Sequence, residues 1–349
     1  MSTTKKVGVI GAGSFGTAIS NLIALNRIEV LLYSRRQNVI DKINQERKHY
    51  GIPISEHIEL TNDIEKVAKE CTVIFPIVPS SAFRETMKNL GPFLKPYHIL
   101  IHGTKGFDLK EVTEEALMAR QVNIMRKHVC TMSEVIRQES IVVKIGCLSG
   151  PNLASEILEG QPTATVIASQ FTEVIKAGQG ILDSAKFHVF GSHEILGAEL
   201  AGALKNIIAL GSGILGGMGM GKNIQAMLIT RGLTEMINYG KAMGSTAQPF
   251  LGTAGIGDLV ATATSKKSRN YTFGYRIGQG ETPEDIFMSM PELAEGARTL
   301  KIARGLARHY KLHVPITEML YNVVFEGFDK KRALYYLMKY PYAVDVDFL

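Results

Sequence analysis

The residues of this chain best suited to chemistry are a lysine and a carboxylate that both stand in apolar surroundings. Residues 196–219 carry only four polar side chains, which are Glu199, Lys205, Asn206 and Ser212. Burying an ammonium group is costly unless it is paired, so we expect Lys205 to face a cleft or a partner. A partly desolvated lysine exchanges protons near neutrality, which oxidation of an alcohol requires as hydride leaves carbon. The alternative is a lysine whose apolar stem extends to the surface.

The carboxylate belongs to Asp258, which follows two glycines in Gly255-Ile256-Gly257-Asp258-Leu259-Val260-Ala261-Thr262. Asp258 is expected either to pair with Lys205, to bind a substrate hydroxyl, or to act as a helix N-cap. Thr262 follows one helical turn later, so both side chains would share a face. The next segment, Ser265-Lys266-Lys267-Ser268-Arg269-Asn270, supplies cations and hydrogen-bond donors suited to a phosphate group. Its alternative is a solvated basic loop.

A glycine motif near the N-terminus predicts a dinucleotide site. Gly11-Ala12-Gly13-Ser14-Phe15-Gly16 lies between an apolar strand, residues 7–10, and a helical stretch, the order in which GxGxxG binds dinucleotides. Gly11 permits the tight turn, Gly13 lets the backbone approach a pyrophosphate, and Gly16 brings the helix close to the sheet. The helix N-terminus then offers free N–H groups to the phosphates. The alternative is an ordinary glycine-rich turn.

The residues after the second predicted strand, 29–33, indicate which dinucleotide is bound. An acidic residue at this place would hold the ribose 2′-hydroxyl of NAD, but the chain has Ser34-Arg35-Arg36. Arg35 and Arg36 suit a 2′-phosphate, because arginine makes charge-assisted, bidentate bonds to phosphate. We therefore expect NADP as the preferred cofactor, with NAD as the second choice. A solvated basic turn is the alternative.

Composition places the chain among soluble globular proteins of two domains. It has 349 residues, of which 45% are hydrophobic and 21% charged. The net charge of +6 suits anionic small molecules and gives no reason to expect nucleic acid as a partner. The histidines show no metal-ligand spacing, so no metal site is expected. A homodimer is compatible with the sequence, which leaves the oligomeric state open.

The same composition predicts a cytoplasmic protein. The three cysteines are scattered and odd in number, as is usual in a reducing compartment. The first strand begins almost at once, which leaves no room for a signal peptide. The apolar segment 207–220 is short and broken by glycines, so no stable membrane insertion is expected.

The order of predicted elements indicates an α/β fold followed by helices. Strands are expected at residues 71–78, 98–102, 141–148, 163–168 and 187–190, and alternation with helices predicts a Rossmann-type, doubly wound parallel sheet. Beyond them the pattern is helical, at residues 194–215, 223–242, 296–311, 316–325 and 330–338. We therefore predict a dinucleotide-binding domain over residues 1–192 and an all-helical substrate domain over 193–349. The cleft between two such domains is the expected substrate site.

Taken together, these motifs resemble bacterial NAD(P)-dependent glycerol-3-phosphate dehydrogenase over nearly the whole chain. Besides the glycine motif, they are Gly103-Thr104-Lys105-Gly106, Ser149-Gly150-Pro151, Leu204-Lys205-Asn206, Ile229-Thr230-Arg231-Gly232, Gly257-Asp258-Leu259 and Ser268-Arg269-Asn270. The resemblance implies reversible reduction of dihydroxyacetone phosphate to sn-glycerol 3-phosphate, which feeds glycerophospholipid synthesis.

The resemblance also implies roles for individual residues. Lys205 matches the proton acceptor, with Asp258 beside it, and Lys105 matches a lysine near both cofactor and substrate. The positions that match cofactor contacts are Ser14, Phe15, Arg35, Ala154, Arg269, Leu293 and Glu295. Gly150 matches a substrate contact, and the substrate phosphate site corresponds to Ser268, Arg269 and Asn270. We add Asn152, Asn206 and Thr262 as further candidates for substrate contact.

Two departures from the family pattern stand out. Asn152 occupies a position where the family commonly has Thr or Ser, and it keeps the capacity to form hydrogen bonds. The segment 121–138 is longer than usual, and we expect a surface excursion there rather than an effector site. Two other functions remain open: a β-hydroxyacid-type dehydrogenase with a different substrate, and a sensor that binds NADPH without turnover.

Overall fold

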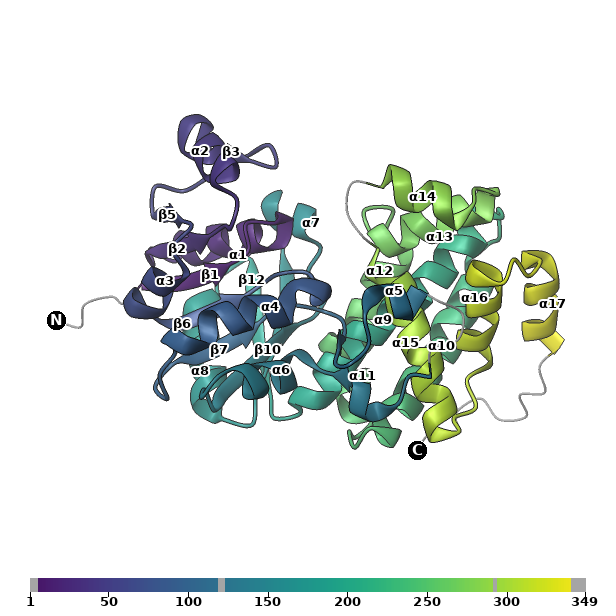
Figure 1. Cartoon of the computed structure of the whole chain (residues 1–349). Helices are drawn as coiled ribbons and strands as arrows, with labels where there is room; N and C mark the ends of the chain where they lie inside the picture. Colours follow the sequence, from purple (N-terminus) through teal and green to yellow (C-terminus); the bar gives the residue numbers. More distant parts are fainter. Residues whose placement is uncertain (1–5, 119–122, 291–293, 340–349) are drawn as a thin grey trace. The chain divides into compact units, whose positions relative to one another are not determined.

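The computed structural model describes residues 6–118, 123–290 and 294–339, which form two compact units (Figure 1). The first unit comprises residues 1–108 and 131–195, and the second comprises 109–130 and 196–349. The predicted single boundary after residue 192 does not describe this division, because residues 109–130 pack on the helical unit. Glu114 forms an ion pair with Arg298 at 2.6 Å, and Ile124 packs directly against Gly305.

An eight-stranded sheet forms the centre of the first unit. Its order is β12-β11-β10-β7-β6-β1-β2-β5, and every neighbouring pair is parallel except β10 and β11. The strands are β1 (Lys6–Ile10), β2 (Val30–Tyr33), β5 (Ile58–Thr61), β6 (Cys71–Pro76), β7 (Ile99–His102), β10 (Lys144–Ser149), β11 (Thr163–Ala168) and β12 (Phe187–Ser192). The predicted fold class, a doubly wound, mostly parallel sheet, is therefore confirmed.

Helices cover both faces of this sheet (Figure 1). On one face α1 (Ser14–Leu25) contacts α7 (Ala154–Leu158) and α8 (Thr172–Leu182). On the other, α4 (Ser80–Leu90) contacts α3 (Ile64–Glu70) and α6 (Met132–Glu139). The central strands are continuous apolar runs because they are buried on both sides. The remaining elements of this unit are α2 (Gln37–Glu46), η1 (Gly91–Phe93) and the hairpin of β3 (Lys48–His49) and β4 (Ile52–Pro53).

The expected surface excursion over residues 121–138 is wrong for the part that the structure describes. The strand β9 (Val129–Cys130) is buried and pairs with β8 (Asp108–Leu109). Helix α6 follows and buries an apolar face. Thr131 and Glu134 form a capping box at its start, which ends the preceding strand and begins the helix. The sequence does indicate a buried helix face here, because Met132, Val135 and Ile136 follow helical spacing. The charged residues between and around them make this pattern hard to recognise.

The second unit is helical and is built around α9 (Ile195–Gly217). Glycines let α13 (Arg269–Gln279) pack closely on α9, since a Cβ atom at Gly213 would lie 2.1 Å from the Tyr271 carbonyl oxygen. α9 is long and apolar enough to cross a membrane, yet 89% of its most apolar window is buried inside the structure. The other helices are α5 (Glu114–Met118), η2 (Arg126–His128), α10 (Lys222–Ala242), α11 (Gln248–Leu251), α12 (Asp258–Thr264), α14 (Pro283–Ser289), α15 (Glu295–Tyr310), α16 (Pro315–Phe325) and α17 (Lys330–Lys339).

A buried carboxylate joins two helices of the second unit. Glu235 of α10 accepts hydrogen bonds from the backbone N–H groups of Ile316 and Thr317, at 2.6 and 3.0 Å, and from the Thr317 hydroxyl. These donors belong to the first turn of α16, whose N-terminus favours a negative charge. Burial nevertheless dominates, and it raises the pKa of Glu235 to about 7.

Candidate active site

The glycine motif has the geometry that dinucleotide binding requires. Gly11 has a φ of +114°, and a Cβ atom there would lie 2.1 Å from the Ile77 carbonyl oxygen. A Cβ atom at Gly16 would lie 1.8 Å from the Gly11 carbonyl oxygen, so this glycine lets α1 approach the end of β1. Gly13, in contrast, has no atom within 4 Å of its Cβ position and is exposed. The loop is therefore closed on its inner side and open where phosphate would approach.

In the described part of the chain, no side chain caps the N-terminus of α1. Gly13 is its N-cap in extended conformation, without a side-chain cap, and the first turn contains no acidic residue. Ser14 and Phe15 are half-buried, and the Phe15 ring lies against Gly103 at the end of β7. These residues fit a bound dinucleotide, because a helix N-terminus of this kind favours an anion.

Arg35 and Arg36 are exposed directly after β2. The Gly11 N–H donates to the Tyr33 carbonyl oxygen at 3.0 Å, which holds the end of β2 beside the glycine loop. Arg36 is also the N-cap of α2, again without a side-chain cap. Within the described part of the chain neither guanidinium pairs with a carboxylate. The adenosine end of a dinucleotide would therefore meet two cations and a second helix N-terminus.

Lys105 and the turn after β10 lie together in the first unit. The Lys105 ammonium donates to the Gly150 carbonyl oxygen at 2.8 Å. Gly150 has a φ of +152°, and a Cβ atom there would lie 3.0 Å from Cα of Thr165, so only glycine fits. The turn thus presents a fixed carbonyl group to the lysine.

Asn152 has a structural part in this turn. Its Nδ2 donates to the Ala164 carbonyl oxygen at 3.2 Å, and its Oδ1 accepts from the Thr165 hydroxyl at 2.8 Å. Both groups of the amide therefore connect the turn to β11. Ala154 is half-buried two residues later, at the start of α7.

Lys205, Asp258 and Thr262 form a buried cluster in the second unit. The Lys205 Nζ lies 2.5 Å from Oδ1 of Asp258 and 2.6 Å from Oγ1 of Thr262. The residues are 5%, 1% and 4% exposed, so the pair stands in a largely water-free environment. The Thr262 hydroxyl donates in turn to the Asp258 carbonyl oxygen at 2.7 Å. Of the interpretations left open by the sequence, pairing of Asp258 with Lys205 is the one observed.

The local backbone explains how a short helix can present Asp258 to α9. Residues 253–257 form a π-helical turn, in which a Cβ atom at Gly255 would lie 2.1 Å from the Phe250 carbonyl oxygen. Gly257 is the N-cap of α12, and Asp258 is its first residue, so the carboxylate does not act as the cap. At the other end the Ser212 hydroxyl donates to the Ala263 carbonyl oxygen at 2.7 Å. Both ends of α12 are thus held against α9.

The N-terminus of α13 carries the predicted phosphate-binding residues. Ser268 is its N-cap and accepts from the Tyr271 N–H, while Arg269 is exposed at the first position. The Asn270 amide donates to Oδ1 of Asn206 at 2.9 Å and accepts from the Gly296 N–H at 2.8 Å. The three helices α9, α13 and α15 therefore meet at this amide.

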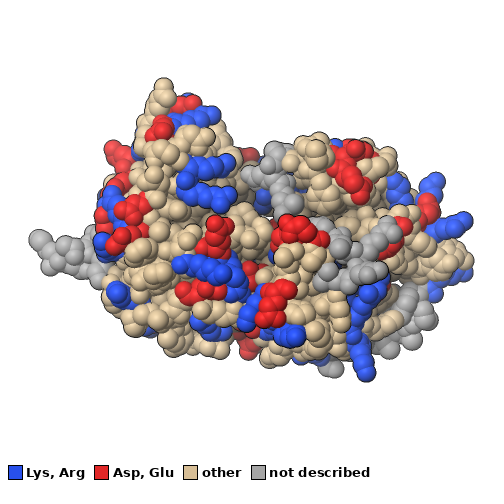
Figure 2. Space-filling view, viewed as in Figure 1, with Lys and Arg blue, Asp and Glu red and all other residues tan. Residues whose placement is uncertain are grey.

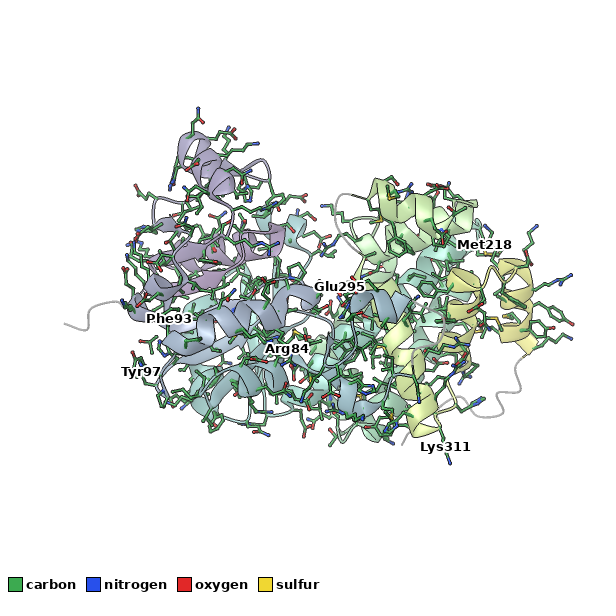
Figure 3. All side chains as sticks on the ribbon, in the orientation of Figure 1. Arg84, Phe93, Tyr97, Met218, Glu295 and Lys311 are labelled. Atoms are coloured by element: carbon green, nitrogen blue, oxygen red, sulfur yellow. The ribbon has the colours of Figure 1, made fainter. Side chains whose placement is uncertain are left out.

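The last predicted cofactor contacts lie at the start of α15. Glu295 is half-buried at the first position of this helix (Figure 3). Leu293 lies outside the described residues. Among the residues that the structure describes, no group of three or more His, Cys, Asp or Glu side chains could hold a metal ion.

Sequence reasoning missed one residue beside the glycine loop. The His49 Nε2 lies 3.0 Å from the Ala12 carbonyl oxygen, because the β3–β4 hairpin folds back towards the start of α1. Asn21 of α1 holds the same hairpin through hydrogen bonds to Pro53 and Ser55. The sequence around His49 matches no motif. Only its place in the chain, between β2 and β5, could have drawn attention to it.

Comparisons with known proteins agree with these observations. Models of the N-terminus and the C-terminus of NAD-dependent glycerol-3-phosphate dehydrogenase match residues 6–175 and 194–335. The chain is 37% identical to glycerol-3-phosphate dehydrogenase [NAD(P)+] of Teredinibacter turnerae, covering 99% of this chain and 98% of the relative. The enzyme of the same name from Carboxydothermus hydrogenoformans is 38% identical, covering 95% and 96%.

Solved structures give the same result. The crystal structure of glycerol-3-phosphate dehydrogenase from Coxiella burnetii matches with a TM-score of 0.85 and 29% identity, covering 96% of this chain and 99% of that one. A D-mandelate dehydrogenase shares the fold at a TM-score of 0.57 and 12% identity, covering 92% and 97%. The motifs, the fold and these matches show that the chain belongs to the NAD-dependent glycerol-3-phosphate dehydrogenase family.

Proposed function

We propose that this protein catalyses the reversible reduction of dihydroxyacetone phosphate to sn-glycerol 3-phosphate with NADPH, and less efficiently with NADH. The observation that carries the proposal is the buried cluster of Lys205, Asp258 and Thr262, a proton-transfer group held by two partners. The relatives of the chain bear the name of this activity. In this proposal the first unit binds the cofactor and the second binds the substrate.

The first unit has the groups that would hold the dinucleotide. The open side of Gly13 and the N–H groups at the start of α1 suit the pyrophosphate, with Ser14 and Phe15 beside them. Arg35 and Arg36 suit the 2′-phosphate, which supports the preference for NADP. When bound, the reduced nicotinamide supplies hydride to the carbonyl carbon of the substrate.

Lys205 supplies the proton in the direction of reduction. Its ammonium group gives a proton to the substrate oxygen as negative charge develops there, and its neutral amine takes the proton back in the reverse direction. Asp258 and Thr262 hold Nζ in one place, so little reorganisation is needed during the reaction. We assign Lys105 as a second cation, placed by the Gly150 carbonyl group for contact with substrate and cofactor.

The N-terminus of α13 is the proposed site of the substrate phosphate. Arg269 offers charge-assisted hydrogen bonds, and the first turn of an eleven-residue helix favours an anion. Asn206 and Asn270 lie beside it in one hydrogen-bonded pair, which connects the phosphate site to α9 only one residue after Lys205. Substrate recognition and proton transfer are thus built on the same helix.

The test is an assay of NADPH oxidation with dihydroxyacetone phosphate and a panel of 2-keto and 3-keto acids. We expect turnover with dihydroxyacetone phosphate alone and sn-glycerol 3-phosphate as product. Turnover with a keto acid instead would indicate a β-hydroxyacid-type dehydrogenase. NADPH binding without turnover of any ketone would indicate a sensor, and either result would overturn the proposal.

We further propose a cytoplasmic location and a role in supplying glycerophospholipid synthesis. Cys71, Cys130 and Cys147 are buried and form no disulfide in the described part of the chain, which supports a reducing compartment. A homodimer stays a prediction, which light scattering of the purified protein would test.

A further inference from the structure

Helix α17 packs on the second unit with one face only. Ala333 is buried, and Leu334 and Leu337 are half-buried on the same side. The Lys330 ammonium donates to the Ile277 carbonyl oxygen at 2.8 Å, which holds the start of the helix on α13. These four positions follow helical spacing, so the opposite arc of α17 faces solvent.

That solvent-facing arc combines cations with large apolar side chains. Tyr335, Tyr336 and Met338 are 59%, 56% and 57% exposed. The cations of the arc are Lys331, Arg332 and Lys339, all exposed. Side chains of α17 project away from α16 in Figure 3, and Figure 2 shows Lys and Arg gathered over this helix. We call these six residues the α17 arc.

Carboxylates do not neutralise the α17 arc within the described part of the chain. The arc itself contains none, and Asp329 is engaged as a cap that accepts the Arg332 N–H at 2.8 Å. Glu281, which follows the end of α13, pairs with Arg276, and Glu318 of α16 pairs with Arg304 of α15. The positive charge of the arc is therefore available to an external anion.

We propose that the α17 arc binds the surface of an anionic phospholipid bilayer, a property that goes beyond the proposed catalytic function. Lysine and arginine are attracted to anionic headgroups, and tyrosine favours the interface between headgroups and acyl chains. The α17 arc has six side chains on one ten-residue helix, whereas each side of a stable protein interface contributes about 20–30 residues. The arc is therefore too small for a stable protein interface. A lipid surface needs no such complementary area, and the binding is peripheral and sensitive to salt.

The experiment is co-sedimentation of the full-length protein with vesicles. One set contains phosphatidylcholine alone and the other phosphatidylcholine with phosphatidylglycerol, each at low and at high salt. The test variant is K331Q/R332Q/K339Q. The matched control, K42Q/K88Q/K95Q, removes the same charge from exposed lysines of the first unit. A second variant, Y335S/Y336S, keeps the charge and removes the aromatic rings.

We expect binding to the anionic vesicles at low salt only. Each cation near the membrane surface raises the affinity for anionic vesicles about fivefold. The test variant should therefore bind about 100-fold more weakly, while the control stays close to wild type. The tyrosine variant should also bind more weakly. No binding of the wild type at low salt, or an equal loss in the control, would overturn the proposal. A change of oligomeric state in the test variant with unchanged sedimentation would assign the arc to a protein interface instead.

Discussion

Replacing Lys205 by methionine tests the proposed proton donor and the buried ion pair in one variant. Methionine keeps a long, unbranched side chain in the apolar surroundings of α9 but cannot donate a proton. The substitution leaves Asp258 without its cation, and the side chain of Asp258 is only 2% exposed. Loss of activity and loss of stability are therefore both expected, and they must be measured separately.

Each effect has an expected magnitude. Removing one partner of a buried ion pair destabilises a protein by about 3–5 kcal/mol. General acid–base catalysis accounts for a factor of about 10²–10⁴ in rate, and the lost charge near the developing alkoxide increases this factor. The double variant K205M/D258N removes the uncompensated charge as well. It should recover most of the lost free energy of unfolding while turnover stays low.

Two measurements separate these effects. Urea unfolding followed by circular dichroism gives the stability of each variant, and NADPH oxidation with dihydroxyacetone phosphate gives kcat. NADPH affinity, measured by fluorescence titration, should stay close to wild type because Lys205 lies outside the cofactor unit.

Different results would contradict the role of Lys205 as proton donor and the burial of its ion pair. If K205M/D258N is as stable as wild type and keeps a tenth of its kcat, Lys205 is not the proton donor. If K205M alone unfolds at the same urea concentration as wild type, the ion pair does not have the buried character that its 7% and 2% side-chain exposures indicate.

Three further predictions concern the cofactor, the substrate and pH. R35A/R36A should lose the preference for NADPH because its KM for NADPH rises, while its kcat with NADH stays nearly unchanged. Equal kcat/KM of the wild type with NADPH and NADH would contradict recognition of the 2′-phosphate by these arginines. R269A should raise the KM for dihydroxyacetone phosphate about 10- to 100-fold, as loss of a charged hydrogen bond implies, but leave slow turnover of unphosphorylated dihydroxyacetone unchanged. Burial raises the pKa of Glu235 from 4.5 to about 7 in the folded state, so its contribution to stability is present below pH 4.5 and is lost as pH rises through 7. Between pH 4.5 and 8 the free energy of unfolding of the wild type should therefore fall by about 3 kcal/mol more than that of E235Q, as measured by chemical unfolding. The same pH dependence of unfolding free energy in both proteins would refute this.

The features that sequence reasoning predicted well depend on local backbone geometry or on simple periodicity. The roles of Gly11 and Gly16 follow from a turn that any side chain would block, and the structure shows both contacts. The strand at residues 163–168 has the predicted limits. The predicted strand 141–148, in contrast, begins only at Lys144, because Ile141 and Val143 point to solvent. An apolar pattern alone does not show which residues the sheet covers.

The sequence alone determined that a lysine stands in an apolar helix, that a glycine loop opens a βα unit and that two arginines follow the second strand. These conclusions need only neighbouring residues. Tertiary structure decided the rest: that Lys205 pairs with Asp258, 53 residues away, that Asn152 braces a turn against β11, and that residues 109–130 join the helical unit. Contacts of this kind depend on how distant helices and strands are oriented on one another. Close packing of α9, α12 and α13 sets that orientation, and no short stretch of sequence encodes it.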